Sequence, residues 1–233
     1  MKTCEEWSLE FDLLYNNIAS DQAPGLEEYE KSVFLTRAQE AVVLGLYRGS
    51  FGDAFESTEE VTAYLDVLVK QADFNPVEEE ESVSGQKLSD SSVLFENPED
   101  MLLRTWESCS VTTECGETGV PVIPVTQDEY WRTVRNPFKK QNGRRVLRLA
   151  FAADGGEAAE YGRQGYTELI SDYPVSKYTV RYLARPEPII LVDLPDALTI
   201  NGSSAKATCK LEEALHQTIL TEAVRLAKAA WLS

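Results

Sequence analysis

The sequence predicts an α+β protein in which a helical bundle is built from both ends of the chain and holds an inserted, antiparallel β-rich domain. Helical periodicity dominates near each terminus, and short segments rich in β-branched and aromatic residues lie between. No internal repeat is visible. The predicted parts are an N-terminal helical part at 1–76, an acidic flexible connector at 77–92, a β-rich insert at 93–205 and a C-terminal helix at 206–233 that returns to the bundle.

The strongest helical pattern lies at the end of the chain, over residues 211–231. Its apolar residues recur at three- and four-residue steps on one face: Leu211, Leu215, Ile219, Ala223, Leu226, Ala227 and Ala230. Acidic residues lie in its first turn and basic residues in its last turn, which the helix dipole favours. Because this apolar face needs a partner, we expect the two ends of the chain to pack together.

Three further helices are predicted before residue 76. The first follows the capping box Thr3-x-x-Glu6, and its apolar stripe is Trp7, Phe11, Leu14 and Ile18. The second runs from about 26 to 47 and ends near Gly49, with an inward face of Leu26, Tyr29, Val33, Ala41, Val42, Gly45 and Leu46. The third follows Ser57-x-x-Glu60 and stops at Asn75-Pro76, with Val61, Tyr64, Leu65, Leu68 and Val69 inward.

The helical period of the apolar residues ends before the acidic, serine-rich stretch 78–92, which is interpreted as a loop, and short strand-like segments follow it. The predicted strands are Leu102–Ser110, Pro121–Val125, Val146–Ala152, Tyr166–Ser171, Lys177–Leu183 and Ile189–Leu194. Thr126-x-x-Glu129 predicts a short helix from about 128 to 134. Asn201-Gly202 predicts a tight hairpin turn.

Charge is distributed unevenly along the chain, whose net charge is −17. The first 100 residues hold 23 acidic and 6 basic residues, and the remaining residues hold 16 of each. This asymmetry argues against a general nucleic-acid coat protein and gives each copy surfaces of different charge. No run approaches the roughly 18 apolar residues of a membrane span, and residues 1–6 lack the apolar core of a signal peptide, so no membrane partner is expected.

The sequence offers no credible catalytic constellation, metal site or cofactor site, so an enzyme is not expected. The single histidine, His216, has no cysteine or acid spaced to form a triad or a ligand set with it, and we expect it to pack. The four scattered cysteines predict free thiols in a reducing compartment: Cys4, Cys109, Cys115 and Cys209. Their spacing does not fit a zinc site.

The most informative segment for binding is basic and aromatic. Between Arg132 and Arg148 there are seven bases and no acid. The candidate inter-subunit or DNA contacts are Arg132, Arg135, Lys139, Lys140, Arg144, Arg145 and Arg148, with Trp131 and Phe138 as aromatic anchors.

Three interpretations of this segment are open. It could contact nucleic acid, because bases neutralise phosphates and aromatics stack on nucleobases. It could meet the acidic part of a neighbouring copy. It could also be a solvated loop whose aromatics anchor it to its own sheet. The uneven charge favours the contact between copies over nucleic acid.

Several long stretches resemble a virion structural protein of crAss-like and related Bacteroides phages. The stretches are 10–39 (Glu10-Phe-Asp-Leu-Leu-Tyr15 onward), Pro124–Tyr130 followed by Asn136–Lys140, Tyr182–Pro195 and the closing helix. They stand in the same order as in that family and together span almost the whole chain. Residues 76–120 and 152–166 resemble it least.

This resemblance implies a head-to-tail connector, or ring (adaptor), protein: a closed ring, usually twelve-fold, below the portal of a tailed phage. Such a ring joins capsid to tail and lines the DNA passage. The implied partners are further copies of the chain, the portal protein, neighbouring tail or ring proteins and passing genomic DNA without sequence-specific contact. The implied location is the neck of the virion, after synthesis in the host bacterial cytoplasm. The alternatives are another neck or tail ring protein, or a nucleic-acid-binding phage protein acting through 132–148.

Overall fold

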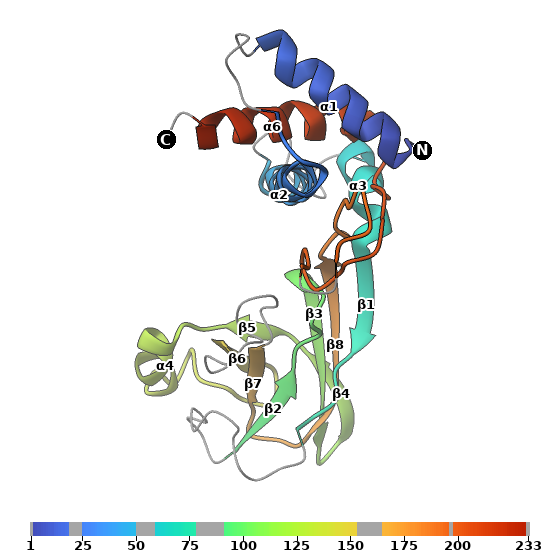
Figure 1. Cartoon of the computed structure of the whole chain (residues 1–233). Helices are drawn as coiled ribbons and strands as arrows, with labels where there is room; N and C mark the ends of the chain where they lie inside the picture. The colour runs from blue at the N-terminus through green and yellow to red at the C-terminus, as the bar shows by residue number, and fades with distance from the viewer. Residues whose placement is uncertain are drawn as a thin grey trace. The chain divides into compact units, whose positions relative to one another are not determined.

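The computed structural model describes residues 2–18, 25–49, 59–77, 91–152, 165–195 and 198–231. The chain forms two compact units, drawn in Figure 1: unit 1 holds residues 1–68 and 185–233, and unit 2 holds residues 69–184. The α+β class expected from the sequence is confirmed. Most of the predicted acidic connector, residues 78–90, lies outside the described residues.

Unit 1 is built from helices at both ends of the chain. Its helices are α1 (Cys4–Ile18), α2 (Glu28–Arg48), α3 (Glu59–Leu65), which a 3-10 turn at Asp66–Leu68 follows, and α6 (Glu213–Trp231). Figure 1 shows α6 lying between α1 and α2, and it contacts both. The expected packing of the two ends of the chain is therefore confirmed. None of the described helices is long and apolar enough to cross a bilayer.

The caps of α1 and α2 follow from local sequence. The Thr3 N–H donates to the Glu6 carboxylate (2.7 Å), and the Glu6 N–H donates back to the Thr3 hydroxyl (3.2 Å), as the capping box predicts. The Thr3 N–H also holds the pKa of Glu6 below its usual value. Gly49 ends α2 with φ 75°, a conformation that glycine adopts without strain.

A buried lysine joins α1 to α2. The Lys31 ammonium donates to Asp12 (2.7 Å), Glu28 (3.0 Å) and the Ser8 hydroxyl (3.1 Å). Burial by itself lowers the pKa of Lys31, but the hydrogen bonds to the two carboxylates outweigh this effect and raise the pKa. Lys31 therefore stays charged, and its buried charge is compensated as such groups require.

The buried face of α2 differs from the predicted one because it is partly polar. Ser32, Thr36 and Gln39 are buried, whereas the predicted Ala41 is exposed. These three polar side chains bond the backbone of the extended segment 187–191. The bonds run from Gln39 Nε2 to Glu187 O (2.9 Å), from Ile189 N to Thr36 Oγ1 (3.1 Å) and from Leu191 N to Ser32 Oγ (3.0 Å).

The polar face of α2 explains why the prediction of a strand at Ile189–Leu194 is wrong. The segment is extended, but its backbone groups are satisfied by side chains of α2 and by a single antiparallel bridge between Ile190 and Ala207. Buried backbone groups need partners, and here a helix supplies several of them in place of a strand. The predicted turn at Asn201-Gly202 is confirmed, with positive φ at both residues (49° and 79°).

His216 packs in the helical core, as predicted. It is 1% exposed, and its ring lies 5.0 Å from the Trp7 ring, centroid to centroid. Its Nε2 lies 3.1 Å from the carbonyl oxygen of Leu211. Burial lowers the pKa of His216 and outweighs the hydrogen bond with the Leu211 carbonyl, which raises it; nearby Lys2 lowers the pKa further.

We therefore expect the free energy of unfolding to fall as the pH drops from 7.5 to 5.5. The unfolded chain takes up the proton first, because an unperturbed histidine has a pKa near ~6.5 and the folded pKa is lower. Urea titrations across this pH range measure the effect, and His216→Gln should flatten it, since the chain has a single histidine. An equal slope in the variant would contradict the assignment to His216.

Unit 2 contains two four-stranded sheets. The strands are β1 (Val69–Asp73), β2 (Ser92–Glu96), β3 (Met101–Thr113), β4 (Gly116–Val120), β5 (Val122–Pro124), β6 (Val146–Ala152), β7 (Gly165–Ile170) and β8 (Val175–Ala184). Sheet A has the order β1-β8-β3-β4, and sheet B has the order β2-β7-β6-β5. All neighbouring pairs are antiparallel except β5 with β6, which is parallel. The prediction of an antiparallel insert is thus wrong at this one pair.

Alternation along β6 gives sheet B two buried faces. Val146 packs in the core shared with sheet A, whereas Leu147 and Leu149 pack on the other side. There they meet Tyr130 of α4 (Gln127–Val134), the short helix predicted after Thr126. Because side chains alternate along a strand, Arg148 lies on the same face of β6 as Val146, toward sheet A.

Three elements of unit 2 differ from the predictions. The third helix was predicted to reach Asn75, but α3 ends at Leu65 and residues 69–73 form β1, which pairs with β8. Strands β2 and β4 were not predicted. β4 is the sequence Gly-Glu-Thr-Gly-Val, whose glycines have low strand propensity, and it forms by pairing with β3 across a tight turn.

The four cysteines are free thiols, as predicted, and three of them are buried. Burial raises the pKa of Cys109 and of Cys209 to about 11, and it also raises the pKa of Cys4. We expect a thiol reagent at pH 8 to label one equivalent rapidly, at the exposed Cys115, and four in denaturant. Cys115→Ser should remove the fast phase, and rapid labelling of two or more sites in the native chain would contradict this burial pattern.

Candidate interaction surface

The basic and aromatic segment forms α4 and the loop that follows it, residues 135–145, here called the α4 loop. Tyr130 fixes this region to unit 2, because it is 4% exposed and packs against Leu147, Leu149 and Ile170. The sequence prediction named Trp131 and Phe138 as the aromatic anchors. In the structure these two side chains are 57% and 84% exposed, so within the chain Tyr130 is the buried aromatic of the segment.

The first turn of the α4 loop presents Phe138. Asn136 holds this turn: its side-chain oxygen accepts from the Phe138 N–H (2.9 Å), and its carbonyl accepts from the N–H groups of Lys139 (3.0 Å) and Lys140 (2.9 Å). Such a turn is stabilised locally by the asparagine side chain. Phe138 is therefore held outward by a fixed backbone, between the exposed Lys139 and Lys140 and the exposed Arg135.

A second turn closes the α4 loop. The Asn142 side chain accepts from the Arg144 N–H (2.9 Å), and the backbones of Asn142 and Arg145 form a bridge. A Cβ at Gly143 would stand 3.0 Å from the Tyr173 ring, so this close approach suits glycine. The Arg145 guanidinium donates to the Phe138 carbonyl oxygen and thereby ties the second turn to the first.

Arg148, also a predicted contact residue, is partly buried in unit 2 and does not belong to the exposed basic surface. Its Nε is 3.1 Å from a carboxylate oxygen of Glu107, and the two side chains are 17% and 14% exposed. The Tyr178 hydroxyl donates to the other oxygen of Glu107 (2.7 Å), and burial raises the pKa of Tyr178, so this donor keeps its proton. The charge of Arg148 is therefore compensated within the chain.

Other polar side chains extend this group between the sheets. Arg104 of β3 donates to Asn97 and to Thr167 of β7, and Thr167 donates to Asn97 (2.7 Å). Burial lowers the pKa of Arg104. The register of β3 shifts between Arg104 and Trp106. This irregularity lets both Arg104 and Glu107 face inward, although residues three positions apart in a regular strand lie on opposite faces.

The remaining candidates form a basic surface. Arg132, Arg135, Lys139, Lys140 and Arg144 are exposed, and none of these five forms an ion pair with a residue that the structure describes. In the part of the chain that the structure describes, no group of three or more His, Cys, Asp or Glu side chains could hold a metal ion. The exposed cations suit the recognition of acidic groups, and the exposed Phe138 ring suits contact with an apolar pocket.

An outward aromatic among exposed cations, on a loop whose turns are held by hydrogen bonds, is typical of a protein that works through contact with other macromolecules. The chain belongs to the phage tail ring protein 3/4 family, whose sequence model matches residues 1–232. The family resemblance stated from the sequence is thereby confirmed.

Two relatives come from Bacteroides phage crAss001. Ring protein 3 is 40% identical over 233 residues, a match that covers 97% of this chain and 94% of that protein. Ring protein 4/5 is 32% identical over 232 residues and covers 97% of this chain and 92% of that protein. The similarity therefore extends across both units.

Proposed function

We propose that this chain is a structural protein of a tailed-phage virion and that its copies associate side by side into a closed ring around the DNA passage. The observation that carries the proposal is the match of the whole chain to a tail ring protein family, together with the exposed basic surface of the α4 loop. Its role is mechanical and not enzymatic.

A closed ring needs two different surfaces on each copy. A heterologous contact joins one patch of a subunit to another patch of the next, and the ring closes when the rotation between them divides a full turn. The basic α4 loop is one such patch. The partner patch is acidic, because the first 100 residues hold 23 acids and 6 bases.

The names of the relatives support a position in the neck or tail of the virion. The relatives are named ring protein 3 and ring protein 4/5, and the family is described as a tail ring, so we place this chain in the neck or tail. Its axial neighbours are other ring proteins, with the portal at the head end of the same passage. We propose a twelve-fold ring with a helical bundle in each subunit, assembled from copies made in the host cytoplasm. With a net charge of −17 per copy, the bore repels DNA and lets it slide without sequence-specific contact.

Negative-stain electron microscopy and native mass spectrometry of the purified chain test this proposal. We expect closed rings at high protein concentration, with twelve copies in class averages and in the mass. Rings of another copy number would contradict the twelve-fold symmetry alone. A monomer at every concentration would contradict the proposed function.

A further inference from the structure

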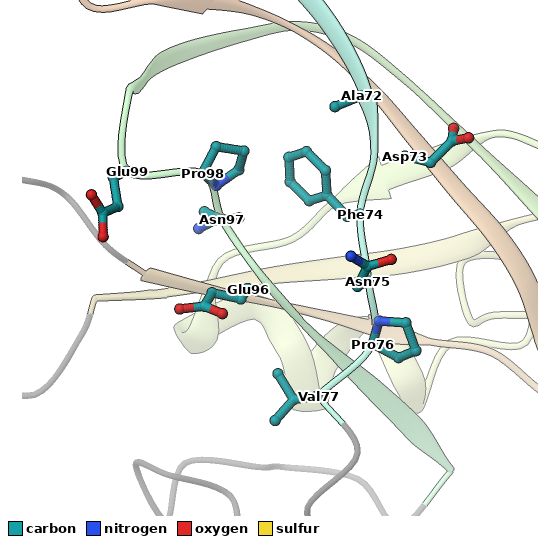
Figure 2. Close-up of a pocket in the computed structure, with 10 residues that line it drawn as sticks. All are labelled: Ala72, Asp73, Phe74, Asn75, Pro76, Val77, Glu96, Asn97, Pro98 and Glu99. Atoms are coloured by element: carbon teal, nitrogen blue, oxygen red, sulfur yellow. The ribbon is translucent and has the colours of Figure 1, made fainter.

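Unit 2 contains an open pocket of about 450 Å³ where the chain passes from sheet A to sheet B. One wall is formed by residues 72–77 and the other by residues 96–99, as Figure 2 shows. Five of the ten lining residues are polar or charged and five are apolar: Ala72, Phe74, Pro76, Val77 and Pro98. The Phe74 ring, which is 7% exposed, faces Pro98.

The pocket walls are held on both sides by hydrogen bonds. The Phe74 N–H donates to the Tyr178 carbonyl (2.9 Å) in sheet A. Three residues later, the Val77 N–H donates to the Leu94 carbonyl (2.8 Å) in sheet B. On the opposite wall, Asn97 is 7% exposed and belongs to the buried polar group with Arg104. A pocket with walls fixed in this way is formed before anything binds, which favours binding.

The rim of the pocket is acidic. Its ten lining residues include Asp73, Glu96 and Glu99 and no basic residue. Asp73 forms an ion pair with Lys177 (3.1 Å), so part of its charge is compensated. Glu96 and Glu99 are exposed on the wall opposite, on the same side as Pro98 in Figure 2.

We propose that this pocket receives Phe138 of a neighbouring copy, with Lys139 and Lys140 of that copy meeting the acidic rim. The proposal rests on the proposed ring and names its lateral contact. The two surfaces are complementary in both respects: an exposed aromatic meets the apolar side chains around Phe74 and Pro98, and exposed cations meet carboxylates. Aromatic side chains seated in pockets and surrounded by a charged rim are the residues that commonly dominate such interfaces.

The two surfaces lie on different parts of the same unit. Figure 1 shows α4, which leads into the α4 loop, on the side of unit 2 away from β1, whose last residues line the pocket. A copy can therefore give its loop to one neighbour and its pocket to another. Such a contact is heterologous and builds rings, whereas a two-fold contact would stop at dimers.

Site-specific cross-linking tests the contact without removing Phe138. Lys140→Cys and Glu99→Cys are combined in a Cys115→Ser chain, which removes the exposed native thiol. A short bismaleimide should give a ladder of dimers, trimers and longer covalent oligomers on a denaturing gel. The matched control combines Glu99→Cys with Arg132→Cys, an exposed cation outside the turn that carries Phe138, and should remain largely uncross-linked.

The outcomes separate this inference from the proposed function. If the unsubstituted chain forms rings but Lys140→Cys with Glu99→Cys gives no ladder, the inference is wrong and the ring proposal stands. Covalent dimers without longer species would mean a two-fold contact and would also overturn the inference. If the unsubstituted chain forms no rings, the proposed function itself fails.

Side-chain truncation and charge exchange test how much Phe138 and the charged residues contribute to the contact between copies. Phe138→Ser should raise the concentration needed for assembly by about 30-fold, the effect of losing a central aromatic contact, whereas Trp131→Ser should change it less than about threefold. Lys139→Glu with Lys140→Glu should block assembly, and adding Glu96→Lys with Glu99→Lys should restore it. Unchanged rings in Phe138→Ser, together with lost binding of single-stranded DNA, would identify a nucleic-acid surface and overturn the inference.

Discussion

Replacement of Arg148 by methionine is expected to lower the free energy of unfolding of unit 2 by about 3–5 kcal/mol. The cause is Glu107, whose carboxylate would keep its largely buried position and lose its cationic partner. Methionine fills a similar length of space, so the loss reports the charge and not a cavity. Urea denaturation of the full chain, followed by circular dichroism, measures the change.

Two variants test the cause of this effect. Arg144→Met removes an exposed cation of the same segment and should change the free energy of unfolding by less than about 0.5 kcal/mol. Arg148→Met combined with Glu107→Leu removes both charges and should recover much of the loss, because an apolar replacement of a buried ion pair is often tolerated. Equal losses for Arg144→Met and Arg148→Met would show that Arg148 is not buried in an ion pair.

The second large effect is expected in unit 1, where Trp7→Ala should cost about 3–5 kcal/mol. Trp7 is 0% exposed and packs on His216 of α6, so its loss leaves a cavity between the first and last helices. Thermal denaturation should show a lower midpoint for the transition of unit 1. Leu9→Ala on the same helix is the control, since Leu9 is 70% exposed and should cost little. Similar losses at both positions would contradict the packing of α1 on α6.

The terminal helices could be predicted because local signals and tertiary packing agree. In α6, the predicted Leu215, Ile219, Ala223 and Ala227 are buried, as the helical period of the apolar residues indicates. Leu220 and Val224 are buried as well, because α6 contacts both α1 and α2, whereas the predicted Ala230 is exposed. In α2 the period of the apolar residues predicted the buried face only in part. Its buried face includes Ser32, Thr36 and Gln39, whose partner is the backbone of a segment about 150 residues later.

The extent of the third helix was wrong for a similar reason. Val61, Leu65 and Leu68 fit a helical period and are buried, but Val69 begins β1. Residues 69–73 are strand because β8 offers a matching edge more than 100 residues away. Local propensity does not contain that information, and tertiary pairing overrides it.

The sequence predicted which segment carries the basic surface, but it could not predict which of the basic residues are exposed. Alternation along β6 places Arg148 on the face opposite Leu147, yet whether that face meets solvent or another sheet depends on β3. The acid that pairs with Arg148 is Glu107, and the irregularity in β3 that turns it inward has no sequence signal as clear as a glycine or a proline. The pocket likewise joins residues 72–77 to 96–99 across a long intervening stretch.

The outer strands of the two sheets discourage aggregation between copies of the chain that lie close together. The described outer strands are β1, β4, β2 and β5, and each is five residues long or shorter. Lys70, Glu96, Glu117 and Pro124 stand in these four strands, where a charge or a missing N–H discourages the addition of a foreign strand. Copies concentrated beside one another are thereby protected from open-ended amyloid-like growth, which would compete with an assembly of fixed size.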